Sequence, residues 1–152
     1  MVEEGAPAPD FELTTDAGER VKLSDFRGKP VVLYFYPKDD TPGCTAQACE
    51  LRDEYSLFRQ RGAVVLGVSP DDEASHARFR EKYSLPFTLL ADPDRSVSEE
   101  YGVWVEKNRF GRKSMGIKRS TFVIDEDGRV ARAMYGVKPE GHADRVLEVL
   151  EA

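Results

Sequence analysis

The sequence predicts an α/β domain in which a central mixed β-sheet is flanked by helices and preceded by an N-terminal β-hairpin. Two continuous apolar runs, 31–36 and 63–68, enclose a segment with helical periodicity, which is typical of parallel strands joined by a crossover helix. Near the C-terminal end, the strand-like segments 120–124 and 129–135 flank Asp-Glu-Asp-Gly, a hairpin signal. A parallel pair and an antiparallel pair together make the sheet mixed.

The totals are those of a soluble globular protein. The 152 residues suit one domain, which we expect to span 1–152, and 40% hydrophobic with 33% charged residues is ordinary composition. The net charge of -6 argues against nucleic acid as a partner, because a phosphate-binding surface needs a basic excess. The first residues lack a signal-peptide pattern, and no apolar run approaches the roughly 18 residues of a membrane span. We therefore expect a cytoplasmic protein that does not bind membranes.

The N-terminal hairpin is predicted by alternation. Phe11 and Leu13 alternate with polar neighbours, residues 16–19 form a turn signal, and Val21 and Leu23 alternate again. A loop that ends at proline then leads into the first buried strand.

The segment after that strand predicts a long amphipathic helix. Thr41 is a suitable N-cap and Pro42 suits the first helical position, where a missing N–H costs nothing. Gly62 is a suitable terminator. Spacings of four and three place one apolar stripe toward the core, formed by Cys44, Ala48, Leu51, Tyr55 and Phe58.

Further elements follow from similar signals. We expect a helix from Asp71–Asp72 to about residue 83, a strand at 87–90, a brief helix capped by Asp92, and a last helix with its apolar stripe at 143–150. The polar, basic segment 104–116 is assigned to a loop or weak hairpin, with a solvated charge run at 107–113.

The two histidines are expected to be solvated. His76 and His142 lie far apart in the sequence, each within a predicted helix. Two cysteines and two histidines lack the close ligand pairs of a metal site, so we expect no metal and no cofactor.

Both cysteines of the chain lie in the predicted long helix. A thiol in the first turn, as at Cys44, faces unpaired backbone N–H groups and the positive end of the helix dipole, which favour thiolate. The alternatives are structural: Cys44 could be a small core hydrophobe on the helix stripe, and Cys49 an inert surface thiol.

The spacing of the cysteines limits what they can do while the helix is intact. Five residues along an ideal helix separate two Cα atoms by about 8 to 9 Å and rotate them by roughly 140°. A disulfide needs Cα atoms within about 7 Å. If Cys44 and Cys49 pair, the first turns must unwind, which suits a catalytic cycle better than a structural link.

Thiolate formation alone would accelerate little. Lowering a thiol pKa from about 8.5 to about 6 raises the thiolate fraction at pH 7 roughly 30-fold. The accompanying loss of nucleophilicity cancels about 13-fold of that gain. An efficient thiol enzyme therefore needs other groups that stabilise the transition state.

The residues that supply such groups carry a family resemblance. Pro37-Lys-Asp-Asp-Thr-Pro-Gly-Cys44 resembles the Pro-x-x-x-Thr/Ser-x-x-Cys motif of the peroxiredoxins, and the second cysteine at plus five resembles the bacterioferritin comigratory protein (PrxQ) branch. The segment 116–125 is similar to the one that carries the active-site arginine of that family, and segments at 10–13 and 91–93 also match. The resemblance thus covers essentially the whole chain.

The resemblance implies a thioredoxin-like fold and a residue for each role. Cys44 would be the peroxidatic nucleophile, and Thr41 with the Cys44 N–H would hold the peroxide oxygens. Arg119 would stabilise the thiolate and the developing charge, with Pro37 shielding the site from water. As further roles implied by the resemblance, Gln47 would help to hold the arginine, and the resolving cysteine would be Cys49.

The resemblance also implies partners. The substrates would be hydrogen peroxide and alkyl hydroperoxides, and thioredoxin or a similar dithiol would reduce the resulting disulfide. The branch suggests a monomer or weak homodimer. Two other functions fit the same scaffold, a thiol–disulfide oxidoreductase and a redox sensor or holdase. The first is disfavoured because the sequence has no Cys-x-x-Cys, and the second because nothing in the sequence names a partner.

Overall fold

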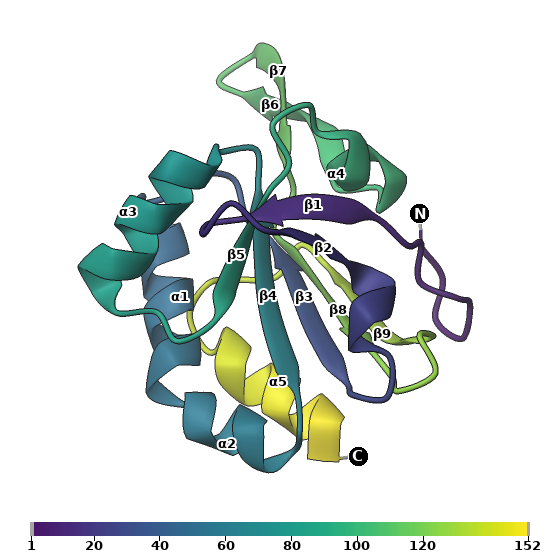
Figure 1. Ribbon diagram of the computed structural model, residues 1–152. Helices are drawn as coiled ribbons and strands as arrows, with labels where there is room; N and C mark the ends of the chain where they lie inside the picture. The colour runs from purple at the N-terminus through teal and green to yellow at the C-terminus, as the bar shows by residue number, and fades with distance from the viewer. Residues whose placement is uncertain (1, 152) are drawn as a thin grey trace.

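The computed structural model describes residues 2–151 and places seven strands in one mixed sheet, in the order β2-β1-β5-β4-β3-β8-β9 (Figure 1). β3 pairs in parallel with β4, and β4 with β5, whereas the other pairs are antiparallel. The predicted mixed sheet, with its N-terminal hairpin and closing antiparallel pair, is therefore confirmed. The seven strands are β1 (Glu12–Thr15), β2 (Arg20–Lys22), β3 (Val31–Phe35), β4 (Val64–Ser69), β5 (Thr88–Ala91), β8 (Ser120–Ile124) and β9 (Val130–Tyr135).

The central strand β3 divides the core into two halves. Val32 and Tyr34 pack among the helices on one face, while Leu33 and Phe35 belong to the core on the other face. All five β3 residues are buried, because both faces of the sheet are covered, and each large apolar side chain buried in this way stabilises the fold by about 1.5–3 kcal/mol.

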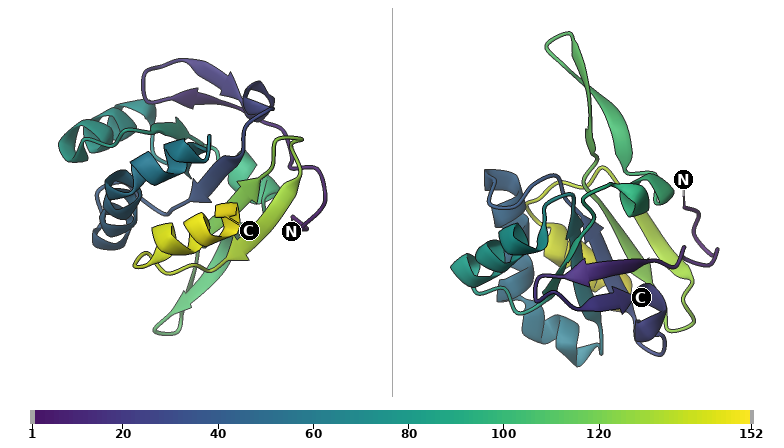
Figure 2. Two further views of the ribbon diagram at one scale, coloured as in Figure 1. Left: turned by 90° about the horizontal axis from the view of Figure 1, so that it is seen from below. Right: turned by 45° about the horizontal axis from the view of Figure 1, so that its top comes forward.

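Four helices cover one face of the sheet (Figures 1 and 2). They are α1 (Pro42–Asp53), α2 (Tyr55–Gln60), α3 (Glu73–Tyr83) and α5 (His142–Glu151). The other face is covered by α4 (Ser96–Glu100), the short 3-10 helix at Leu23–Phe26 and the N-terminal segment. Asp72 caps α3 by accepting the Ser75 N–H, and the Asp92 carboxylate accepts two N–H groups at the start of α4, as expected. Within residues 2–151, no helix combines the length and the apolar character needed to cross a bilayer.

The long helix predicted from Pro42 to Gly62 is in fact two helices. α1 ends at Asp53 and α2 begins at Tyr55, with Glu54 between them at φ -105° and ψ 12°. The Leu57 N–H bonds to the Glu54 carbonyl, a three-residue spacing tighter than that of an α-helix. Neither proline nor glycine marks this break, so the apolar stripe continues across it and gave no sign of it.

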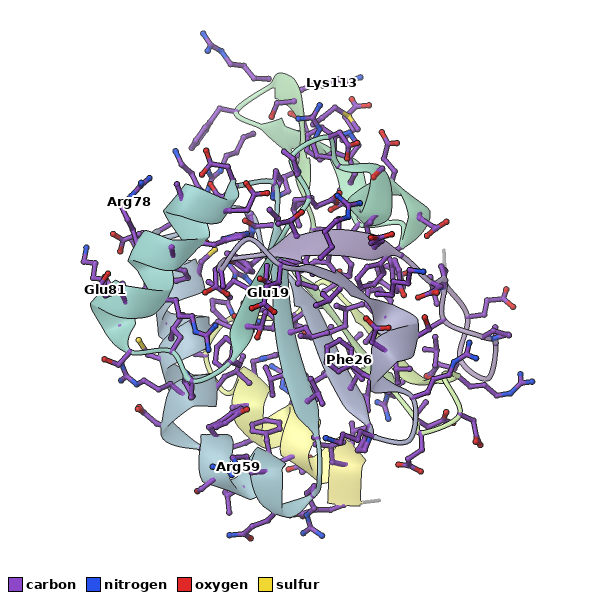
Figure 3. All side chains as sticks on the ribbon, in the orientation of Figure 1. Glu19, Phe26, Arg59, Arg78, Glu81 and Lys113 are labelled. Carbon is purple, nitrogen blue, oxygen red and sulfur yellow. The ribbon has the colours of Figure 1, made fainter. Side chains whose placement is uncertain are left out.

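The segment 104–116, predicted as a loop or weak hairpin, forms a regular hairpin that projects from the body of the molecule (Figure 2). Its strands are β6 (Trp104–Arg109) and β7 (Arg112–Ile117), paired along their full length. Phe110 and Gly111 at the tip both have positive φ, the conformation that a tight two-residue hairpin turn requires. Side chains near the tip, such as Lys113, point outward (Figure 3).

Candidate active site

The site lies where β3 ends and the chain turns into α1. Thr41 precedes the helix with extended backbone and Pro42 occupies the first turn, as predicted. Cys44 therefore sits in the first turn, where backbone N–H groups lack helical partners, and its side chain is 2% exposed. This edge of a parallel pair, at the carboxyl end of the strands, is where ligands commonly bind in α/β proteins.

A single guanidinium connects the cysteine to the helix behind it. Arg119, in the short link between β7 and β8, donates from Nη2 to the Cys44 sulfur at 3.3 Å and from Nη1 to Gln47 Oε1 at 2.6 Å. The group also lies against the helix backbone, since a Cβ placed on Gly43 would approach Nη2 to 3.1 Å. The structure thus joins Cys44, Arg119 and Gln47, although 75 positions separate the cysteine from the arginine.

Thr41 and Pro37 line the same open pocket as Cys44 and Arg119. Thr41 occupies the N-cap position, but the expected side-chain cap is absent: its hydroxyl donates to the Lys38 carbonyl at 2.9 Å. Because the proton of the hydroxyl is used in this way, its oxygen presents lone pairs that can accept a hydrogen bond from a ligand.

The projecting hairpin supplies the opposite wall, which the sequence did not predict. Lys107, Asn108, Arg109 and Ser114 all line the pocket. Partial burial, together with the charges of Arg119 and Arg109, lowers the pKa of Lys107. With Lys38 and Arg119, four cationic side chains therefore line the pocket and favour bound or developing negative charge. The basic run at 107–113 was the available signal, but a charge run is usually only a solvated surface.

Cys49 lies on the same helix and is not bonded to Cys44. Both thiols are free, Cys44 buried and Cys49 partly exposed. α1 is continuous from Pro42 to Asp53, so the five-residue helical spacing keeps the two Cα atoms beyond disulfide distance.

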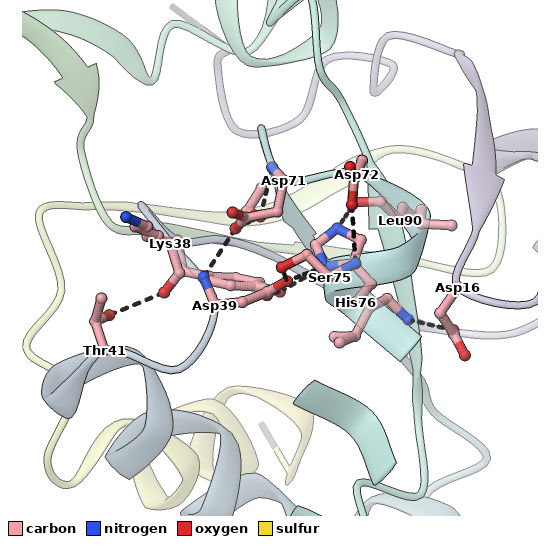
Figure 4. Close-up of polar contacts among 12 residues, drawn as sticks. Asp16, Lys38, Asp39, Thr41, Asp71, Asp72, Ser75, His76 and Leu90 are labelled. Atoms are coloured by element: carbon pink, nitrogen blue, oxygen red, sulfur yellow. Dashed lines mark hydrogen bonds and ion pairs between the residues drawn. The ribbon is translucent and has the colours of Figure 1, made fainter. Parts of the chain in front are cut away.

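His76 anchors the loop that precedes the cysteine, and the expectation that it is solvated is wrong (Figure 4). The ring is fully buried, with Nδ1 2.7 Å from Asp39 Oδ2 and Nε2 2.9 Å from the Leu90 carbonyl. Both nitrogens face acceptors, an arrangement that favours the doubly protonated ring. Burial lowers the pKa of His76, but hydrogen bonding and the charge of Asp39 more than offset this and the pKa is raised. Its spacing of three from the buried Phe79 places His76 on the apolar side of α3, a signal that was missed.

Asp39 forms further hydrogen bonds besides its contact with His76. Its carboxylate accepts from the Tyr36 and Ser75 hydroxyls at 2.5 and 2.8 Å, and its N–H donates to Asp71 at 2.8 Å. The ligand atoms of Asp39, Asp71 and His76 lie within 4.8 Å of one another, close enough for a metal. Each residue already bonds within the protein, and we assign the group to anchoring the loop.

Asp40 forms a second set of hydrogen bonds between the same loop and α3. Its φ of 56° is uncommon for a residue other than glycine. The carboxylate accepts from Lys82 Nζ and the Tyr83 hydroxyl, both at 2.7 Å. The side chains of Asp39 and Asp40 therefore bond this loop to α3.

His142 is also buried, at 1% exposure, so the expected solvated position is again wrong. Its Nε2 lies 2.6 Å from Thr121 Oγ1, and its Nδ1 lies 3.3 Å from Gln47 Nε2. Burial, with the charges of Arg145 and Arg119, lowers the pKa of His142 to about 4. Its spacing of four from Val146 places it on the buried stripe of α5, again a signal in the sequence.

Comparisons with known proteins find relatives over nearly the whole chain. Residues 5–133 match the family model described as AhpC/TSA family. The chain is 53% identical over 146 residues to the putative peroxiredoxin bcp of Coxiella burnetii, covering 96% of this chain and 97% of that protein. It is 49% identical over 150 residues to the peroxiredoxin Bcp of Bacillus subtilis, covering 99% and 96%.

Solved structures give the same result. PrxQ of Xylella fastidiosa, a cysteine-to-serine mutant, superimposes with a TM-score of 0.94 at 35% identity, covering 99% of this chain and 96% of that one. The bacterioferritin comigratory protein of Xanthomonas campestris, described for its alkyl peroxide reduction activity, superimposes with a TM-score of 0.91 at 36% identity, covering 98% of both chains.

The chain belongs to the AhpC/TSA family, the class of thiol peroxidases with a thioredoxin-like fold. Within that class it is a peroxiredoxin of the bacterioferritin comigratory protein (PrxQ) type. The predicted family, fold and enzyme class are thereby confirmed.

The two buried histidines affect stability in opposite directions. The raised pKa of His76 adds stability that is complete below its ordinary pKa of about 6.5 and is lost as the pH rises through the folded-state value. The pKa of His142 is lowered to about 4, so stability falls as the pH drops from about 6.5 to about 4. The loss of folding stability caused by His142 over this pH range amounts to about 3 kcal/mol.

We predict two widely separated histidine titrations. Because the chain has only two histidines, NMR of the imidazole rings should resolve one ring that titrates near pH 4 and one that stays charged above pH 6.5. A His76→Asn variant assigns the signals. Two titrations near 6.5 would instead mean that both rings are solvated.

Proposed function

We propose that Cys44 is the peroxidatic cysteine of this peroxiredoxin and that its substrates are hydrogen peroxide and alkyl hydroperoxides. The observation that carries the proposal is the Arg119 guanidinium, which donates to the Cys44 sulfur and to Gln47 at once. A buried thiol with a guanidinium on its sulfur and an open pocket before it is arranged for attack on a small polar substrate.

In the first step the Cys44 thiolate attacks one oxygen of the peroxide. A sulfur–oxygen bond forms as the oxygen–oxygen bond breaks, and the hydroxyl group stays on the sulfur. The other oxygen leaves as an alkoxide or hydroxide and takes up the proton that the thiol released on ionising, which gives an alcohol or water. The sulfur is oxidised by two electrons to a sulfenic acid and the peroxide is reduced by two.

The surrounding groups stabilise charge during this step. Arg119 interacts with the thiolate and with the oxygen on which negative charge develops, and the Cys44 N–H and Thr41 hydroxyl hold the peroxide oxygens. Pro37 shields the sulfur from bulk water. Fixed donors of this kind outweigh the small gain from thiolate formation alone.

In the second step the Cys49 thiol attacks the Cys44 sulfenic acid. A disulfide forms within the chain and water leaves. α1 is intact and both thiols are free, so this step requires the first turns of α1 to unwind. Cys49 is partly exposed, which leaves it accessible once the helix opens.

A protein dithiol of the thioredoxin type then reduces the disulfide by exchange and returns both cysteines to thiols. We place the cycle in the cytoplasm, where cellular thiols are kept reduced, and assign the protein as a monomer or weak homodimer.

We predict that Arg119→Gln lowers kcat/KM for hydrogen peroxide by about 10²- to 10³-fold, the usual loss when a charge-stabilising donor is removed. Turnover is measured with thioredoxin, thioredoxin reductase and NADPH. The matched control is Arg112→Gln, which removes an exposed arginine from the adjacent strand and should leave the rate unchanged. Cys44→Ser should abolish turnover; peroxidase activity retained by Cys44→Ser would disprove the proposed role of Cys44.

The resolving step is tested by mass spectrometry after one equivalent of peroxide. We expect the wild type to lose two hydrogens and form a Cys44–Cys49 bond within one chain. Cys49→Ser should stop at the sulfenic acid on Cys44, trapped by dimedone. A disulfide between two chains in the wild type would contradict the assignment of Cys49.

A further inference from the structure

A continuous hydrogen-bonded chain runs behind the cysteine from α5 to the sulfur. Thr121 of β8 bonds to His142, which bonds to Gln47, which bonds to Arg119, which bonds to the Cys44 sulfur. Thr121, His142 and Gln47 are all at most 1% exposed, so no water can replace a missing partner without structural change.

The direction of each bond follows from chemistry. A guanidinium only donates, so the Gln47 atom that lies 2.6 Å from Arg119 is the amide oxygen. The NH₂ group of Gln47 then points at His142, whose Nδ1 must accept with a lone pair. The ring proton consequently sits on Nε2 and is donated to the Thr121 oxygen at 2.6 Å.

We propose that His142 is a positioning residue for the Cys44 site: as a neutral ring it accepts the Gln47 amide, fixes which way that amide faces, and so holds Arg119 on the sulfur. The inference rests on the proposed function of Cys44 for its effect on turnover. The geometry of the chain itself does not depend on that function.

The reverse arrangement shows why the ring matters. If the Gln47 amide turned over, its NH₂ would face the guanidinium and place two donors together. If the acceptor at Nδ1 were removed, a fully buried amide donor would be left without a partner, which lowers the stability of this arrangement. Turning the amide over removes the acceptor that orients Arg119, and loss of the Nδ1 acceptor removes the bond that keeps the amide from turning, although no atom of His142 touches the sulfur.

The surroundings of the ring keep it neutral and in place. The charges that face it are those of Arg119 and Arg145, both positive, and the uncharged neighbours are Gln47, Thr121 and the Tyr34 ring at 6.3 Å. The Glu50 carboxylate of α1 accepts the Gly141 N–H at 2.9 Å, which fixes the start of α5 against the helix that carries Gln47.

Two pairs of variants separate positioning from packing. His142→Leu removes the acceptor at similar volume, whereas His142→Asn can keep an amide oxygen near the Nδ1 position. Thr121→Val is isosteric and keeps the histidine, but it removes the acceptor that holds the proton on Nε2. Val146→Ala is the packing control, because Val146 is fully buried on α5 and is not part of the chain of bonds.

The first readout is independent of peroxide. In the wild type, ¹⁵N NMR should show His142 as the neutral ring with a protonated Nε2 and a bare Nδ1, and Thr121→Val should move it toward the other tautomer. In the Cys49→Ser background, Cys44 should react more slowly with iodoacetamide in His142→Leu and Thr121→Val than in Val146→Ala. These results test the inference even if peroxidase turnover is absent.

The second readout is turnover. We expect His142→Leu to lower kcat/KM for hydrogen peroxide by roughly three- to tenfold, the factor that one hydrogen bond is worth, with partial recovery in His142→Asn and no change in Val146→Ala. Normal Cys44 alkylation and turnover in His142→Leu, or a wild-type ring protonated on Nδ1, would overturn the proposal. A loss as large in Val146→Ala would do so too, since it would reduce the effect to packing.

Discussion

The contact between Arg119 and Cys44 is the interaction on which the rest of the site depends. It joins the first turn of α1 to the link just before strand β8, and the other guanidinium nitrogen donates to Gln47, about one turn further along α1. A thiolate without such a donor gains little rate, because lower nucleophilicity cancels most of the gain in thiolate. In the proposed mechanism, placing a fixed cation at the sulfur is therefore the main chemical task of this fold.

Two demands on α1 conflict, and the structure separates them. In the proposed cycle the helix is intact when Cys44 lies beneath Arg119, and it opens for Cys49 to reach Cys44. The loop before it is bonded to α3 through the Asp39–His76 pair and to Asp71, and neither bond is made to α1. The pocket wall formed by the β6–β7 hairpin is held by pairing between its own two strands.

Sequence patterns predicted the parts that depend on periodicity and on local chemistry. The two buried apolar runs identified the parallel strands, and the Thr-Pro-Gly-Cys start placed the cysteine in the first turn. The patterns failed where an outcome depends on distant contacts. His76 and His142 can be buried because they hydrogen-bond to Asp39 and Gln47, which lie far away in the sequence. The hairpin forms a pocket wall because β6 and β7 project over the pocket.

The most direct test of this account is hydrogen exchange of the reduced and the peroxide-oxidised protein, followed by mass spectrometry. Oxidation should remove protection from the amides of α1, residues 42–53, while the amides of the central strands β3 and β4 stay protected. An intrachain Cys44–Cys49 disulfide together with an equally protected α1 would contradict it.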